Sequence, residues 1–431
     1  MFPALAMLCC LALVPDPGKL HPSVPCQTSS RHTYALYLPT MYREDRLLPV
    51  LFVFSPGADG AGAAVLFQAG AERLGWIVIA SNDARNGPMA PIHEAQAALW
   101  KEAFTQYKAD PRRVYAAGFS GGARMAMVLA EKHRGAFIGL LSVGAFGAGR
   151  SLGPDHLAQV MLCGEEDSNH AELAGAWGRL RGSKGRLLWM EHFPGGHWWA
   201  PKELIEEGMV FLDLAAGLQG RQPRDAAAES AFLRRRVEAA WAKTDEGDRA
   251  QVERRWRDVA ALPGAPVEAE QQAKSLATDP DLRTARSLEV TYADRARRLQ
   301  TSSAYGPELQ RLVGVAAGKG PVALDARRLL ERERGALEEW CREALGKQDW
   351  ELAVKLGRGL VGIGDQGSRG SRGGVLAAMG LAMLGRKEEA LVELKAAFAR
   401  GYKPSRPLVD MPLLTPLQDE VEFKALQNQA R

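Results

Sequence analysis

The first half of the chain alternates two kinds of hydrophobic pattern. Short, continuous apolar runs bounded by glycine, proline and charged residues predict strands that are buried on both faces, as in a parallel sheet. Helix-forming stretches at residues 123–130 and 171–180 lie between such runs. The pattern therefore predicts an α/β domain in which a sheet is flanked by helices. The strand-like runs lie at residues 48–54, 76–80, 114–117, 137–143, 157–164 and 186–193.

The composition changes beyond residue 220. Residues 1–220 hold 19 basic and 20 acidic side chains, whereas residues 221–431 hold 36 and 31. The second part is dense in Ala, Leu, Arg and Glu, and none of the 8 histidines lies in it. This composition is typical of solvated helices and offers no general base of the usual kind. We predict a domain over residues 21–217, a helical linker over 218–265 and an all-α domain over 266–431.

The all-α part contains a faint internal repeat. Residues 380–394 resemble a tetratricopeptide-type helix-turn-helix, and residues 345–354 carry a similar pattern about 37 positions earlier. Residues 362–374, rich in Gly, Ser and Arg, are expected to form a loop between them. Helices over 225–260 and 267–334 would complete the stack. Surfaces of this kind bind peptides or partner proteins, and a scaffold role without a ligand is equally compatible with the pattern.

The N-terminus predicts export. Residues 1–14 form an apolar run of signal-peptide length that is too short to span a membrane, although no basic residue precedes it. We therefore expect a signal segment over 1–20, a secreted or periplasmic protein, and no transmembrane segment. Two of the 5 cysteines lie in this run, so no disulfide framework is expected. A formal charge of +4 gives no reason to expect nucleic-acid binding, and no metal-ligand spacing, dinucleotide fingerprint or P-loop predicts a metal or cofactor.

A Gly-x-Ser-x-Gly motif at residues 118–122 is the strongest chemical signal. It joins a predicted strand to a predicted helix, which is the context in which such a serine is exposed on a tight turn and acts as a nucleophile. Small neighbours permit the bend, hence Gly118 and Gly122. Ser120 is the candidate nucleophile, and a structural turn with a buried serine is the alternative.

A base and an acid follow in the order that a serine nucleophile requires. His197 stands in a glycine-containing loop directly after the run at 186–193, and is the candidate base. An exposed loop histidine is the alternative. Asp167 follows the run at 157–164 and is the candidate acid, with Glu166 as a second choice and a surface acidic cluster as a third reading.

Backbone amides and loop side chains complete the candidate site. The amides of Gly121 and Ala58, after the motif and after the run at 48–54, would stabilise an oxyanion. Trp198 and Trp199 could stack on substrate or pack under the histidine loop. The segment between the runs at 137–143 and 157–164 is too short for a helical cap, which favours an open site and a bulky or polymeric ester. Asn82, with Asp83 and Asn86, follows the run at 76–80 and is expected at the rim.

Together these motifs resemble the α/β-hydrolase superfamily, and within it secreted esterases of the polyhydroxybutyrate depolymerase-like and feruloyl esterase-like groups. The likeness covers about residues 30–217 and rests on residues 110–115, the motif at 118–122, Gly164-x-x-Asp167 and Gly195-Gly196-His197-x-Trp199. It implies roles as nucleophile, base and acid for Ser120, His197 and Asp167. One departure is Pro56-Gly57, which stands where these esterases carry His-Gly.

The sequence thus predicts a serine hydrolase that cleaves carboxylic esters without a cofactor. A serine peptidase would use the same three side chains. A hydrolase fold that binds without catalysis, joined to a protein-interaction domain, is the alternative from another class.

Overall fold

The computed structural model describes residues 15–147, 153–181, 186–242, 248–363, 368–404 and 407–429, with only the backbone for 368–370. Residues 1–14 of the expected signal segment lie outside this range. The chain divides into two compact units, Met1–Glu165 with Asn169–Arg283 and Glu166–Ser168 with Thr284–Arg431. Among the described residues, no helix combines the length and apolar character that crossing a bilayer requires.

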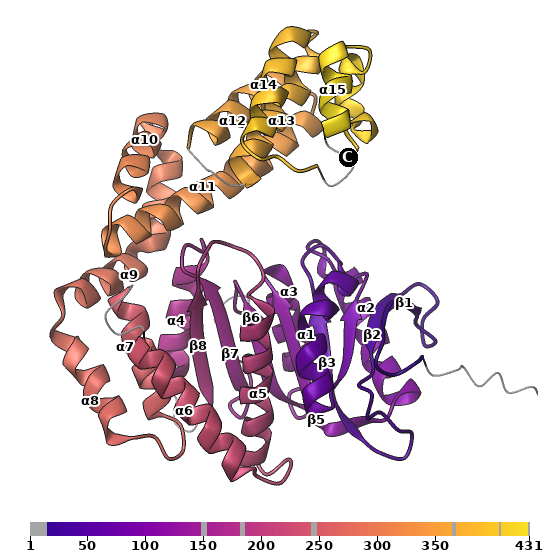
Figure 1. The fold of residues 1–431 in the computed structure, drawn as a ribbon, viewed down its shortest axis with the longest axis vertical. Coiled ribbons are helices and arrows are strands. Elements are labelled where there is room, and N and C mark those ends of the chain that lie inside the picture. The colour runs from indigo at the N-terminus through magenta and orange to yellow at the C-terminus, as the bar shows by residue number, and fades with distance from the viewer. Residues whose placement is uncertain are drawn as a thin grey trace, which may run out of the picture. The chain divides into compact units, whose positions relative to one another are not determined.

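The first unit is built on an eight-stranded sheet of order β1-β2-β4-β3-β5-β6-β7-β8. The pairings of β1 with β2 and of β2 with β4 are antiparallel, and the others are parallel. This mostly parallel sheet, flanked by helices, confirms the predicted α/β fold class (Figure 1). The strands are Leu20–Pro25 (β1), Thr33–Tyr37 (β2), Leu48–Phe54 (β3), Ile77–Ser81 (β4), Ala109–Phe119 (β5), Phe137–Val143 (β6), Ala158–Gly164 (β7) and Leu188–Phe193 (β8).

Helices cover both faces of the sheet (Figure 1). Along β3, Phe52 packs in the core with α2, α3 and α4, whereas Val53 packs in the core with α1 and α5. Because successive strand residues point to opposite faces, a strand covered on both sides must be apolar throughout. The helices expected at 123–130 and 171–180 are α3 and α4. The bounds are Gly60–Leu74 (α1), Met89–Gln106 (α2), Gly121–Lys132 (α3), His170–Arg181 (α4) and Lys202–Leu218 (α5).

Two strands, β1 and β2, were not predicted from the sequence. β1 lies at the edge of the sheet, and its residues Leu20–Pro25 are half-buried or exposed. An edge strand of this kind carries polar residues and proline and lacks the continuous apolar run that marks the buried strands.

Three helices beyond residue 217 also belong to the first unit: Ala226–Ala242 (α6), Arg249–Ala260 (α7) and Val267–Ser275 (α8). The carboxylate of Asp258, on α7, accepts hydrogen bonds from the Met190 backbone N–H at 2.7 Å and from Trp177 Nε1–H at 2.9 Å, and it pairs with Arg181. Met190 lies on β8, the outermost strand. The Asp258 side chain of α7 is therefore the acceptor for a backbone N–H that β8 presents at the open edge of the sheet.

A buried carboxylate on β8 holds α6 and α7 in place. Glu191 is 6% exposed, and its oxygens lie 2.5 Å from Arg236 Nη2 on α6 and 2.7 Å from Arg255 Nε on α7. The guanidinium of Arg236 also lies over the ring of Trp189, 4.4 Å from its centroid. The segment that the sequence suggested as a linker is thus attached to the sheet by paired buried charges.

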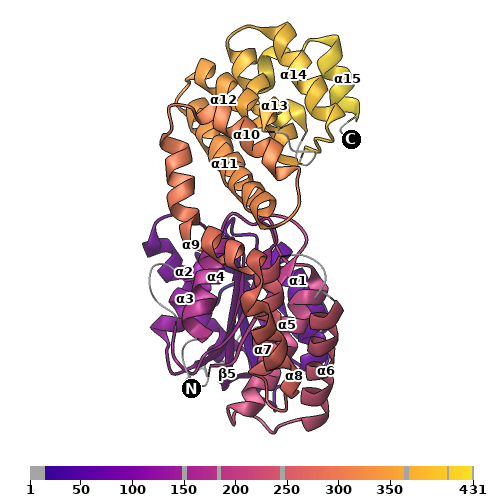
Figure 2. The ribbon, with the colours of Figure 1, turned by 90° about the vertical axis from the view of Figure 1, so that its left-hand side faces the viewer.

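The second unit consists of helical hairpins, in which α11, α12, α13 and α14 pack successively (Figure 2). The hairpin expected at 380–394 is the turn from α13 to α14, with Gly385 at φ +75°. The loop expected over 362–374 is wrong in its second half, because α13 begins at Ser368. The helices are Pro280–Thr301 (α9, whose first turn belongs to the first unit), Tyr305–Ala316 (α10), Pro321–Gly346 (α11), Trp350–Gly362 (α12), Ser368–Met383 (α13), Lys387–Ala399 (α14) and Val421–Gln429 (α15).

Candidate active site

The turn between β5 and α3 holds Ser120 in a conformation that L-residues rarely adopt, with φ 53° and ψ −122°. Added Cβ atoms show why glycine flanks it. At Gly118 such an atom would lie 2.3 Å from the carbonyl carbon and oxygen of Gly122, and at Gly122 it would lie 2.1 Å from the oxygen of Phe54. The backbone is therefore held on both sides of a strained serine, as at a nucleophile elbow.

The structure brings Ser120 and His197 together. Nε2 of His197 lies 2.8 Å from Oγ of Ser120, although 77 positions separate the two residues. The ring of Phe119 packs against the imidazole, with centroids 4.8 Å apart. The hydroxyl donates to Nε2 when the imidazole proton is on Nδ1, and this is the arrangement of a nucleophile with its general base.

Asp167 lies in the segment between β7 and α4, and its side chain is 0% exposed. The alternative acid, Glu166, has a side chain that is 41% exposed. An added Cβ on Gly164, at the end of β7, would lie 2.1 Å from the oxygen of Gly196. The end of β7 and the loop that carries His197 are therefore in backbone contact.

The two expected oxyanion donors differ in their surroundings. Gly121 is the first residue of α3, where backbone N–H groups lack helical acceptors and negative charge is stabilised. Ala58 has φ 60°, and its N–H donates to the Ser55 oxygen at 3.2 Å. This amide is therefore already engaged within its own turn.

Of the side chains expected to contact substrate, Trp198 is exposed, whereas Trp199 and Asn82 are held by contacts within the protein. Trp198 is 51% exposed, and its ring lies against Gly195, where an added Cβ would be 1.8 Å from Cζ2. The ring of Trp199 instead packs on Phe67 and Phe119, with centroids 6.0 and 5.4 Å away.

Asn82 is likewise bound within the protein. Its side-chain amide donates to the Pro22 oxygen at 3.1 Å and to Thr33 Oγ1 at 3.4 Å, which joins the end of β4 to the segments around β1 and β2. Asn86, four residues on, is the member of this loop that reaches the elbow, where its amide lies against Gly121. The sequence indicated the loop but not which asparagine reaches the elbow.

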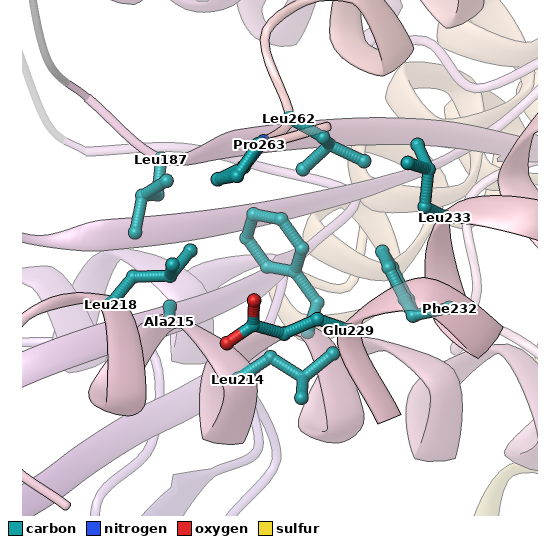
Figure 3. A pocket seen from close by; sticks show the side chains of 10 residues that line it. Leu187, Leu214, Ala215, Leu218, Glu229, Phe232, Leu233, Leu262 and Pro263 are labelled. Carbon is teal, nitrogen blue, oxygen red and sulfur yellow. The ribbon is translucent and has the colours of Figure 1, made fainter. Parts of the chain in front are cut away.

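A small apolar cavity of about 30 Å³ lies away from these residues, between α5, α6 and the segment after α7 (Figure 3). It is large enough for one or two water molecules. Its carboxylate, Glu229, is paired with Arg224 at 2.5 Å. The cavity belongs to the packing of α6 and not to the candidate active site.

Comparison with known proteins yields structural neighbours only. No family model matches the chain, and no curated protein matches it. The solved structures that it resembles include a substrate-bound fluorophosphonate-binding serine hydrolase of Staphylococcus aureus, with 13% identity, TM-score 0.37, and coverage of 46% of this chain and 99% of the other. They also include the S-formylglutathione hydrolase of Staphylococcus aureus (13%, 0.38, 47% and 99%) and a ferulic acid esterase (14%, 0.35, 47% and 100%).

Proposed function

We propose that this protein is a serine hydrolase that cleaves carboxylic esters through an acyl-enzyme. The observation that carries the proposal is the 2.8 Å approach of His197 Nε2 to the hydroxyl of Ser120 on a strained strand-to-helix turn. Strain of this kind persists only where the surroundings impose it, and it concentrates at functional sites.

In the proposed reaction, Ser120 Oγ attacks the ester carbonyl while His197 Nε2 takes its proton. The imidazolium is held by Asp167, whose burial and place after β7 support this role. The Gly121 amide, together with that of Ala58, stabilises the oxyanion. His197 returns the proton to the leaving alcohol, and water then attacks the acyl-enzyme with the same base, releasing the acid and restoring Ser120.

We further propose that the substrate is a bulky or polymer-linked ester of the kind that polyhydroxybutyrate depolymerase-like and feruloyl esterase-like enzymes take. The exposed ring of Trp198, next to the base in the chain, supports this class because a flat aromatic surface stacks on sugar or aromatic groups. An exposed ring such as that of Trp198 can bind one face of a ligand without enclosing it, which suits a group that is part of a bulky or polymeric substrate.

The test is labelling by a fluorophosphonate probe of the whole protein and of Ser120→Ala. We expect the wild type to be labelled and the variant to remain folded and unlabelled. An unlabelled, folded wild type would instead support the non-catalytic binding module. Turnover of matched ester and amide substrates separates an esterase from a peptidase, and faster amide cleavage would overturn the ester assignment.

A groove in the second unit favours a separate binding function there. Its volume is about 700 Å³, and three cations line it together with Leu376 and Met379. No carboxylate is among its described lining residues, and the Glu338 carboxylate beside it pairs with Arg342 at 2.8 Å and with Arg372 at 3.7 Å, which leaves one cation more than the acid can balance. We propose that it binds an acidic peptide with apolar side chains. The acidic groups of such a peptide would face the cations of the groove, and its apolar side chains would pack on Leu376 and Met379. The cations are Arg342, Arg372 and Lys403.

The anisotropy of a labelled peptide with alternating Glu and Leu, compared with one of alternating Lys and Leu, tests this function. We expect the acidic peptide to bind, and Arg372→Glu to weaken binding at least tenfold, the loss expected when like charges meet in an interface. Equal binding of the two peptides, or of neither, would overturn the proposal.

A further inference from the structure

At Gly121, the space that a side chain would take is filled by the side chain of another residue, Asn86. An added Cβ on Gly121 would lie 1.7 Å from Oδ1 of Asn86, 2.7 Å from its Cγ and 3.0 Å from its Nδ2. The amide plane of Asn86 therefore occupies the space that any side chain at position 121 would take. The Asn86 side chain, although exposed, therefore lies directly against the backbone of Gly121 on this side.

The same asparagine is anchored to the loop after β3. Its backbone N–H donates to the Pro56 oxygen at 2.9 Å, and the neighbouring Arg85 forms an isolated antiparallel bridge with Gly57. The loop after β4 thus crosses the loop after β3 and reaches the first residue of α3. Asn86 thus connects the two segments that supply the candidate oxyanion donors, through its backbone to the loop after β3 and through its side chain to Gly121.

This connection matters because of the backbone that it touches. Gly121 and Gly122 follow the strained Ser120 directly, and two consecutive glycines have more conformational freedom than any other pair. An oxyanion donor is effective only when its N–H direction is fixed before the reaction. Since the Ala58 N–H is already engaged with Ser55, the orientation of the Gly121 amide is the more important of the two.

We infer that Asn86 is a positioning residue for the oxyanion hole, acting through Gly121 by filling its missing side-chain volume and by holding it to the loop after β3. The inference rests on the proposed hydrolase function. It assigns Asn86 no proton transfer and no bond to the reacting carbonyl.

Asn86→Ala is the direct test. We expect kcat to fall by about tenfold to a hundredfold, because small displacements of an oxyanion donor have effects of this size. KM should stay within about twofold, since binding of the ground-state ester is not altered. Affinity for a boronic acid that mimics the tetrahedral intermediate should fall in step with kcat, and Tm should not change. Arg85→Ala, next to it on the same loop, is the matched control and should turn over normally.

A double variant separates positioning from general damage. Gly121→Ala alone should be impaired, because its methyl must displace the Asn86 side chain from this position. In Asn86→Ala/Gly121→Ala the methyl enters vacated space, so we expect the double variant to be more active than Gly121→Ala. Normal kcat and boronic acid affinity in Asn86→Ala, or a double variant that is worse than either single one, would overturn the inference. If Ser120→Ala retained activity, the proposed function itself would fail, and the two failures are thereby distinguished.

Discussion

Glycine has different structural roles in the two units: in the first it permits a strained turn at the candidate site, and in the second it permits close helix packing. In the first unit, Gly118 and Gly122 allow backbone to pass against backbone around a strained serine. In the second unit, Gly357 and Gly373 lie where α12 and α13 cross, with an added Cβ on each lying 2.7 to 2.8 Å from the other's oxygen. The first arrangement imposes an unusual conformation on the candidate nucleophile, whereas the second only lets two regular helices approach.

Backbone strain follows the same division. Among the described residues, the non-glycine positions with positive φ in the first unit are Ala58 and Ser120, both at the candidate site. In the second unit, Gln348 has φ 61°, and it stands in the turn between α11 and α12, where a left-handed residue ends a helix. In the first unit the strained positions coincide with the candidate active site, whereas in the described part of the second unit the one such position only ends a helix.

The largest effect should come from removing the proposed base. His197→Ala should lower kcat by about 10⁴- to 10⁶-fold, as loss of a histidine that deprotonates a serine does elsewhere. The kcat of wild type and variant is measured from the hydrolysis of an activated ester. His93→Ala, an exposed histidine on α2, is the matched control and should leave turnover unchanged. Near-normal turnover in His197→Ala would mean that another group is the base.

The buried charges on β8 should have the next largest effect. Glu191→Gln leaves Arg236 and Arg255 without their partner, and breaking a buried ion pair costs about 3–5 kcal/mol of unfolding free energy. Glu393→Gln in the second unit removes a partially exposed pair with Arg358 and should cost about 0–1 kcal/mol. Urea denaturation of both variants measures the contrast, and equal losses would contradict it.

The same carboxylate predicts a pH dependence. Burial alone would raise the pKa of Glu191, but the charges of Arg236 and Arg255 outweigh it and lower the pKa below its usual 4.5. A carboxyl with a lower pKa in the folded state stabilises the protein above the unfolded pKa and loses this contribution as pH falls through the folded pKa. Calorimetry between pH 7 and pH 3 should therefore show a steeper loss of Tm below pH 4.5 in the wild type than in Glu191→Gln.

These contrasts explain what could be predicted from the sequence. The central strands are local signals, because a strand covered on both faces is a continuous apolar run such as residues 48–54. The elbow is also local, since strand, Gly-x-Ser-x-Gly and helix follow one another directly. The order of Ser120 and His197 along the chain predicts that they pair, and Nε2 of His197 lies 2.8 Å from Oγ of Ser120.

What could not be predicted depends on residues far apart. Asp258 reaches a strand amide 68 positions away, so nothing near residue 258 marks its helix as part of the sheet unit. The contact of Asn86 with Gly121 requires one loop to cross another, and no spacing reveals which of several loop asparagines does so. Charge and histidine content distinguish the part of the chain that forms the sheet from the all-helical part. They do not place helices α6 to α8, whose composition suits either unit.

A smaller effect, of opposite sign at two neighbouring positions, tests the role of glycine in the second unit. Gly357→Ala places a methyl 2.7 Å from the Gly373 oxygen, and overpacking of this kind costs about 1–3 kcal/mol. Gly359→Ala meets nothing within 4 Å, so the better helix propensity of alanine should stabilise α12 by up to about 1 kcal/mol. Thermal melts compare the two. Labelling of Ser120 should be normal in both, whereas Gly122→Ala in the first unit should lose it.

The two adjacent tryptophans give the smallest and most selective contrast. Trp198→Ala should raise KM for aryl or sugar esters by about two- to tenfold, the effect of losing one stacking contact, and leave short-chain acetate esters unaffected. Trp199→Ala should instead lower Tm, because its ring packs on Phe67 and Phe119. If Trp198→Ala changed KM equally for all esters, or lowered Tm like Trp199→Ala, its ring would belong to the packing of the histidine loop and the substrate class would have to be sought elsewhere.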